Sequence, residues 1–290
     1  MTTNNAALAV DAASDRNEES PRPFLKWAGG KGFLLDTLRE LMPRSFNTYY
    51  EPFIGGGALF FACRPERAHL VDVNHELINT YQTVRDNVSE VIAELEKHRY
   101  EKEYYYQLRN VDRTPEYQQW TAVERAGRFI FLNKTCFNGL YRVNSKGHFN
   151  VPFGDYSNPK LVDHANLNAC SRALQAAELT IGDFEGVLVS AREGDFVYFD
   201  PPYVPASPTA NFTGFSAGGF TDDDQRRLYQ VCVALHERGV RFMLSNSCTE
   251  LALNLYRAFN YRLVQVPRAI NSKGDKRGKV NELIIRNYEQ

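Results

Sequence analysis

The chain has 290 residues, of which 43% are hydrophobic and 24% charged, and its 34 basic side chains are balanced by 35 acidic ones to a net charge of −1. This composition predicts a folded protein with one large domain, one domain with an insertion, or two balanced domains, and it excludes an array of many small domains. Without an apolar run of roughly 18 residues, a signal peptide or CxxC spacing, we expect a cytoplasmic protein with no membrane span, disulfide framework or metal site.

The predicted elements alternate between strands and helices after a polar tail at residues 1–22, which is expected to be disordered. Runs of β-branched and aromatic residues predict seven strands, at Thr48–Ile54, His69–Val73, Leu179–Gly182, Asp195–Asp200, Val240–Asn246, Tyr261–Val266 and Asn281–Arg286. Helical spacing predicts helices at Gly32–Leu41, Leu77–Leu95 and Asp222–Arg238, the last with Thr221 as its N-cap. This alternation predicts an α/β fold with a largely parallel sheet covered on both faces.

An insertion separates the second and third strands, because the roughly one hundred residues between them are too many for one crossover. We therefore expect one domain from residues 23–75 and 166–290, and a second from residues 76–165. Near the end of the insertion, Asn138-Gly139 and Lys146-Gly147 predict a hairpin. Arg125 to Gly154 carries five lysines and arginines and no acid, and Arg268 to Lys279 carries five more against Asp275 alone. Two such segments favour a polyanionic partner.

A glycine-rich turn follows the first strand, in Tyr50-Glu51-Pro52-Phe53-Ile54-Gly55-Gly56-Gly57. Glycines at the carboxyl end of a parallel strand let the backbone approach a ligand closely. The next strand ends at Asp72, 17 residues after Gly55, close to where nucleotide-binding sheets place an acid for ribose hydroxyls. The turn lacks the GxGxxG spacing of dinucleotide enzymes and has no basic group beside it, which favours a nucleoside without phosphates.

A second motif, Asp200-Pro201-Pro202-Tyr203, ends the fourth strand. Two prolines remove two N–H donors, so their carbonyls and the carboxylate remain as acceptors beside an aromatic ring. Such a cluster suits a planar substrate that carries an amino group.

These motifs resemble those of the Dam-type DNA adenine-N6 methyltransferases, the D12 class, over about residues 23–287. Phe24-Leu-Lys-Trp-Ala-Gly-Gly-Lys31, the glycine turn, the basic loop and Asp200–Tyr203 occur in that family's order. The resemblance implies a Rossmann-like mixed sheet of seven strands with an inserted target-recognition domain. It further implies S-adenosylmethionine as cofactor, S-adenosylhomocysteine as product, no metal, and double-stranded DNA as substrate.

The resemblance also implies residue roles. The cofactor would be bound by Trp27, Lys31, Glu51, Phe53, Gly55, Gly56, Gly57, Asp72, Asp183, Phe184 and Asp200, although a core position for Phe184 is an equal alternative. Catalysis would fall to Asp200, Pro201, Pro202 and Tyr203, with a flipped adenine stacked on the tyrosine.

DNA contacts are likewise implied for nine residues: Lys26, Lys134, Phe137, Asn138, Leu140, Arg142, Asn144, Asn150 and Pro152. Arg142 would read guanine and Leu140 a thymine methyl, which favours GATC. Phe137 and Asn138 would enter the duplex, and Lys26 would contact a base pair from the catalytic side. Lys134, Asn144 and Asn150 would hold phosphates.

Several alternatives stay open. The same fold and cofactor would serve cytosine N4, an adenine in RNA or a protein amide, and a non-catalytic DNA-binding protein is a further alternative. The intact motifs argue against loss of activity, and the absent GxGxxG argues against a nicotinamide-dependent dehydrogenase. We expect a monomer, since no heptad or apolar stripe requires a dimer, and the existence of a restriction partner is left open.

Overall fold

The computed structural model describes residues 20–204, 219–267 and 279–289, and its centre is a seven-stranded sheet in the order β3-β2-β1-β4-β5-β7-β6. The strands are β1 (Tyr49–Glu51), β2 (Ala68–Asp72), β3 (Ala177–Ile181), β4 (Phe196–Phe199), β5 (Arg241–Ser247), β6 (Asn260–Pro267) and β7 (Lys279–Arg286). All seven predicted strands are confirmed. Only β7 runs antiparallel to its neighbours, so the sheet is mixed, as the family resemblance implied.

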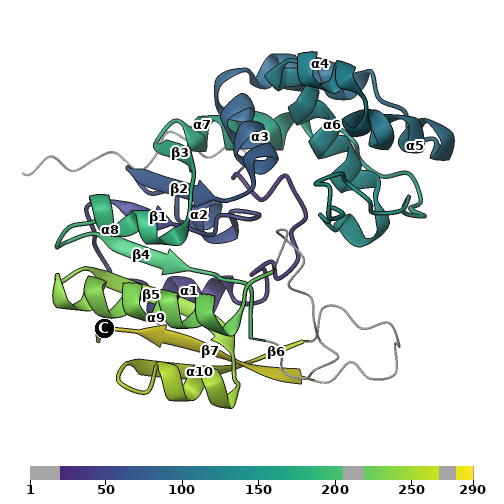
Figure 1. Cartoon of the computed structure of the whole chain (residues 1–290). Helices are drawn as coiled ribbons and strands as arrows, with labels where there is room; N and C mark the ends of the chain where they lie inside the picture. The colour runs from purple at the N-terminus through teal and green to yellow at the C-terminus, as the bar shows by residue number, and fades with distance from the viewer. Residues whose placement is uncertain (1–19, 205–218, 268–278, 290) are drawn as a thin grey trace, which may run out of the picture.

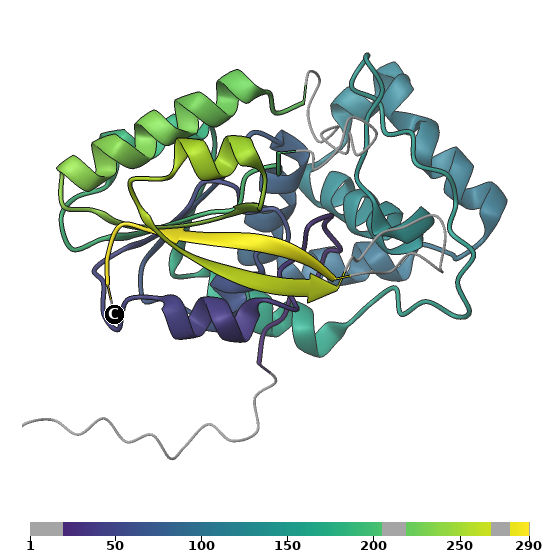
Figure 2. The same ribbon diagram turned by 90° about the horizontal axis from the view of Figure 1, so that it is seen from below.

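Helices cover both faces of this sheet, because its central strands are apolar on both sides. In β4, Phe196 and Tyr198 join one buried cluster, whereas Val197 and Phe199 join the other. Figure 2 shows α9 and α10 on one side of the sheet and α1 on the other. The helices are α1 (Leu35–Leu41), α2 (Ala58–Cys63), α3 (His75–Asp86), α4 (Val88–Glu96), α5 (Lys102–Asn110), α6 (Ala122–Thr135), α7 (His164–Leu174), α8 (Val187–Ser190), α9 (Asp222–Glu237) and α10 (Glu250–Leu255).

Two helix predictions are corrected in their extent. The single helix expected over Leu77–Leu95 is two helices, because Asn87 leaves the helical conformation (φ −137°, ψ 44°) between α3 and α4. The helix expected from Gly32 begins three residues later, at Leu35. The N-cap prediction for α9 is confirmed, since Thr221 and Asp224 form a reciprocal capping box.

The chain between β2 and β3 carries α3 to α7, and Figure 1 shows α4, α5 and α6 on the side toward which the parallel strands point. The expected hairpin after α6 forms through two isolated bridges, Cys136 to Phe153 and Val143 to Phe149, and has no continuous ladder. Its tip is closed by a hydrogen bond from the Asn144 N–H to the His148 carbonyl at 2.9 Å. An irregular loop therefore stands beside the carboxyl edge of the sheet.

Two segments of the sequence lie mainly outside the described residues, namely the polar tail and the basic run Arg268–Lys279. Where the tail enters the described part of the chain, Arg22 binds α7 through Asp163 at 2.7 Å and Asn166 at 3.0 Å. In residues 20–204, 219–267 and 279–289, no helix has the length and apolarity that crossing a membrane requires.

Candidate functional site at the carboxyl edge of the sheet

The glycine turn after β1 is folded tightly against Trp27. Gly55 and Gly57 have φ values of +45° and +66°, which side chains adopt only with strain. A Cβ at Gly55 would lie 2.6 Å from Cδ1 of Trp27, so glycine is required there both by backbone conformation and by space. Tyr81 supports the turn from below by donating its hydroxyl to the Gly55 carbonyl at 3.0 Å.

Asp72 at the end of β2 joins this turn to the next strand. Its carboxylate accepts the Gly55 N–H at 3.2 Å and the Asn74 N–H at 3.0 Å. Burial raises the pKa of this carboxyl to about 6, although those hydrogen bonds oppose the rise. The predicted turn and acid therefore form one connected site.

Two apolar side chains beside Asp72 escaped the sequence analysis. Val73 and Ile181 are 56% and 55% exposed, and Asp72 pairs with Ile181 in the register of β2 and β3. An apolar wall next to a buried acid that can accept hydroxyl groups suits the flat face of a purine. The only sequence signal for this wall was that Val73 directly follows Asp72.

Asp183 and Phe184 lie close by, but they differ in accessibility. Phe184 is only 3% exposed, because it stacks on Phe53 at 5.4 Å and the guanidinium of Arg227 covers it at 5.0 Å. This packing corresponds to the alternative in which Phe184 is a core residue. Asp183 is more open: one carboxylate oxygen accepts the Glu185 N–H at 3.0 Å and lies 3.3 Å from Arg227.

The strongest electrostatic feature is an ion pair between Lys31 and Asp200, with 2.6 Å between Nζ and Oδ1. The Lys31 side chain is 6% exposed; its ammonium also donates to the Gly29 carbonyl at 2.5 Å and lies 4.7 Å from the centre of the Tyr203 ring. Burial raises the pKa of the Asp200 carboxyl to about 6, and the Lys31 charge opposes that rise. The segment Phe24–Lys31 and the end of β4 thus meet at the carboxyl edge of the sheet.

Glu51 adds a second buried acid to this cluster. It is 3% exposed and accepts the Tyr49 hydroxyl at 2.8 Å. Burial, assisted by the negative charge of Asp200, raises its pKa to about 8. Burial thus raises the pKa of Glu51 further than that of Asp200, which has the Lys31 charge beside it.

Residues from three later elements hold the turn after β4, and the sequence analysis missed all of them. Tyr203 donates its hydroxyl to Glu282 of β7 at 2.7 Å. Gln225 of α9 and Asn246 of β5 bind the turn from behind. They lie 23 to 79 residues from their partners, so no local pattern could reveal them.

A buried asparagine of α6 connects the Phe24–Lys31 segment with the irregular loop. Asn133 accepts the Lys26 N–H and donates to the Lys26 carbonyl, both at 2.8 Å, and it also donates to the Gly139 carbonyl at 3.2 Å. Trp27 extends the joint by stacking on Tyr141 with 5.5 Å between ring centres. Lys26 itself lies with its ammonium 4.6 Å from the ring of Tyr156.

The loop presents the expected contact residues unequally. Phe137 is 52% exposed, Asn138 next to it is exposed at φ +56°, and Leu140 is half-buried. Arg142 is exposed and donates through Nε to the Asn150 side chain at 2.6 Å, so Asn150 orients this guanidinium.

Two other expected contacts take part in the loop's own structure, and a third, Lys134, lies on α6. Asn144 uses its side-chain oxygen to accept the N–H groups of Lys146 and His148, at 2.9 and 3.0 Å. The Pro152 carbonyl accepts the Phe137 N–H at 2.9 Å. Lys134 is half-buried, and burial lowers its pKa.

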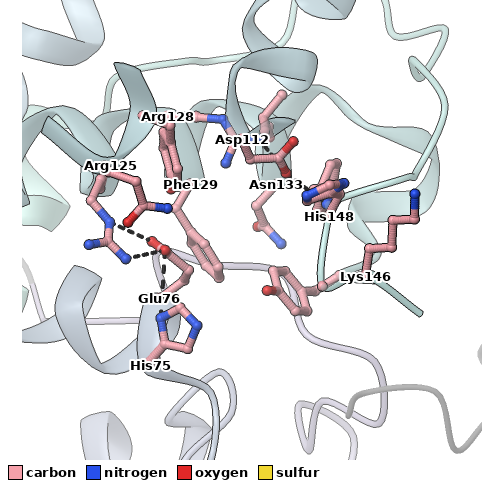
Figure 3. Close-up of a pocket in the computed structure, with 15 residues that line it drawn as sticks. His75, Glu76, Asp112, Arg125, Arg128, Phe129, Asn133, Lys146 and His148 are labelled. Carbon is pink, nitrogen blue, oxygen red and sulfur yellow. Dashed lines mark hydrogen bonds and ion pairs between the residues drawn. The ribbon is translucent and has the colours of Figure 1, made fainter. Parts of the chain in front are cut away.

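A polar cavity of about 320 Å³ lies between α3, α6 and the loop (Figure 3). Two arginines of α6 point to two different acids there: Arg125 pairs with Glu76, and Arg128 pairs with Asp112 at 3.0 Å. Because these guanidinium charges are already neutralised, the cavity is a poor site for a phosphate. Its lining includes Tyr141, whose ring stacks on Trp27, but not Asp72, Lys31 or Asp200.

The carboxyl-edge site fits a nucleoside without phosphates. Asp72 can receive hydroxyl groups, Val73 and Ile181 provide an apolar wall, and Arg227, the cation beside Asp183, is already paired with acids. Trp27, Lys31 and Glu51 then line the far end, toward Asp200. Among the residues that the structure describes, no three His, Cys, Asp or Glu side chains are grouped so as to hold a metal ion.

Comparisons with known proteins agree with this geometry. A family model described as "D12 class N6 adenine-specific DNA methyltransferase" matches residues 27–270. The Type II methyltransferase M1.LlaDCHI of Lactococcus lactis subsp. cremoris is 46% identical over 94% of this chain and 98% of its own length. The Type II methyltransferase M.MjaIII of Methanocaldococcus jannaschii is 42% identical, over 92% and 99% respectively. The DNA adenine methylase of Escherichia coli K12 is 35% identical, over 91% and 94%.

Proposed function

This chain belongs to the D12 class of N6 adenine-specific DNA methyltransferases, and from that premise we propose that it methylates an adenine flipped out of duplex DNA at GATC sites. The observation that carries the proposal is the cluster of Asp200, Lys31 and Tyr203 at the edge of the sheet that also holds the glycine turn and Asp72. An acceptor for an amine and an aromatic face for a base thus lie beside a nucleoside site.

The chemistry follows from the weakness of adenine N6 as a nucleophile, since its lone pair is delocalised into the ring. The Asp200 carboxylate and the Pro201 carbonyl accept the two amine hydrogens, which directs the lone pair out of the ring plane. Bound S-adenosylmethionine supplies the electrophilic methyl group. Lys31 keeps Asp200 ionised and in place, and positioning contributes much of the rate.

Base flipping is supported by the accessibility of the catalytic acid. The Asp200 side chain is only 21% exposed and lies behind the turn, so a base stacked in a duplex cannot reach it. Tyr203 would stack on the extruded adenine, and the exposed Phe137 and Asn138 would fill the gap that the base leaves. Residues 23–75 and 166–290 would then act as the catalytic domain.

Recognition would fall to residues 76–165. The exposed Arg142 can offer its remaining N–H groups to guanine O6 and N7, and the half-buried Leu140 can contact a thymine methyl. The relative from Escherichia coli is named for DNA adenine methylation, which supports the acceptor but not a particular sequence. GATC is favoured because Arg142 and Leu140 match the pattern of family members that read it.

The direct test is transfer of labelled methyl groups from S-adenosylmethionine to duplex oligonucleotides that contain GATC or a variant altered at one base pair. We expect N6-methyladenine, identified by mass spectrometry of the nucleosides, in the GATC duplex alone. Equal labelling of both duplexes would contradict the proposed sequence, and N4-methylcytosine would contradict the acceptor.

The pH dependence of turnover should report the protonation of Asp200. The ionised carboxylate accepts amine hydrogens more strongly than the protonated acid does, so kcat/KM for DNA at saturating cofactor should fall as the pH drops below about 6. This ratio reports groups of the enzyme before DNA binds, and the pKa of Asp200 lies at about 6. The pKa of Asp72 is also about 6, but its protonation should weaken cofactor binding instead. Measuring kcat/KM for DNA and the cofactor Kd separately distinguishes the two acids. A kcat/KM that stays constant down to about pH 5 would contradict the role of Asp200.

A further inference from the structure

Two fully buried side chains, Gln225 and Asn246, form a hydrogen-bonded chain that ends on the turn after β4. Gln225 is 2% exposed and Asn246 is 0% exposed, and they come from α9 and β5, which pack together (Figure 1). Asn246 donates to the Gln225 side-chain oxygen at 3.1 Å, and Gln225 donates to the Pro202 carbonyl at 3.1 Å. Burying an amide side chain costs free energy unless its polar atoms are hydrogen-bonded, so the presence of two linked buried amides calls for a functional explanation.

Backbone groups at both ends of this hydrogen-bonded series determine which side chain donates and which accepts. The Asn246 oxygen accepts the backbone N–H groups of Val204 at 3.3 Å and Ser247 at 2.9 Å, and such groups can only donate. Asn246 must therefore present its NH₂ to Gln225. Gln225 must then turn its own NH₂ toward Pro202, whose carbonyl can only accept.

Two further hydrogen bonds hold the same segment. Ser247 donates its hydroxyl to the Val204 carbonyl at 2.6 Å, and Tyr203 is held by Glu282. Of the two proline carbonyls, that of Pro202 is occupied by Gln225, whereas no donor from the described part of the chain reaches that of Pro201.

We propose that Gln225 and Asn246 are positioning residues that turn the Pro202 carbonyl away from the target amine and so leave the Pro201 carbonyl and the Asp200 carboxylate as its two acceptors. This inference rests on the roles proposed above for Asp200 and Pro201. Two acceptors must meet one amine at once, and a displacement of about 1 Å can cost about 100-fold in rate. The chain supplies the rigidity that this geometry requires.

The test uses Gln225→Met, which keeps the volume but removes the donor, and Asn246→Asp. The carboxylate introduced by the second change still accepts from Val204 and Ser247, but it draws the Gln225 NH₂ away from Pro202. We expect kcat to fall roughly 10- to 100-fold in both, while the cofactor Kd and the KM for DNA change less than about threefold.

Asn287→Leu is the matched control, because Asn287 donates to the Val240 carbonyl and accepts from the Phe242 N–H, both at 2.8 Å, at the opposite end of the same strand. It should lower the melting temperature without lowering kcat. If Gln225→Met and Asn246→Asp lose stability but keep wild-type kcat, while Asp200→Asn is inactive, the positioning role is wrong. If Asp200→Asn itself turns over normally, the proposed catalytic roles fail instead.

Discussion

Replacing Asp200 with alanine is expected to abolish methyl transfer and to leave DNA affinity nearly unchanged. In the proposed mechanism the carboxylate contacts the reacting amine, whereas residues of the insertion hold the DNA, so binding and turnover should separate. Loss of a positioned acceptor costs typically 10²- to 10⁴-fold in rate. Single-turnover rates and binding to a GATC duplex, measured with the same preparation, would show the separation.

A second variant guards this test against a loss of structure. Removing the carboxylate leaves the buried Lys31 ammonium without its 2.6 Å partner, which is destabilising. Asp200→Asn keeps the volume and should also be inactive. Asp195→Asn is the control, because Asp195 is a buried acid at the other end of β4 that accepts the Thr48 and Arg192 N–H groups at 3.1 and 2.8 Å. Its turnover should survive, and turnover by Asp200→Asn within tenfold of the wild type would contradict the mechanism.

Arg142→Ala is expected to relax sequence discrimination at one base pair by about 1–3 kcal/mol, or roughly 5- to 150-fold in the ratio of kcat/KM values. The exposed guanidinium is directed by Asn150, and only a forked donor matches two acceptors on guanine. The measurement compares a GATC duplex with one altered at the guanine.

Two further variants separate base reading from general attraction to phosphates. Arg142→Lys keeps the charge but not the fork, so it should lose discrimination while keeping the salt dependence of binding. Lys146→Ala removes a charge from the same exposed loop and should weaken binding to all sequences equally. If Arg142→Ala discriminates between the two duplexes as well as the wild type does, another residue must recognise the guanine.

The sheet and both of its acids could be predicted because each depends on a local pattern. Short apolar runs revealed the strands, and Asp72 and Asp200 were conspicuous because each ends such a run. The break at Asn87 was missed because apolar spacing continues across it, from Val84 to Val88 and Val91, so periodicity alone indicated one helix.

The supports of the site could not be predicted, because they exist only through tertiary contacts. Gln225 opens an amphipathic helix and Asn246 ends a buried strand, so each resembles an ordinary polar residue until the fold joins them to Pro202. Asn144 likewise gained a role that the sequence did not reveal. Its side-chain oxygen closes the turn of the loop, whereas the phosphate contact that the family resemblance implies stays a prediction.

The joint at Asn133 also bears on how new specificities arise in such enzymes. Its amide binds both the backbone of Lys26, which precedes the sheet, and Gly139, which belongs to the insertion. A Cβ at Gly139 would lie 2.4 Å from Cδ of Lys26, so the two segments have complementary shapes. The insertion therefore cannot be exchanged independently of the rest of the chain. A recognition loop transferred from a relative needs an N-terminal segment of matching shape, so the two segments are expected to change together in evolution.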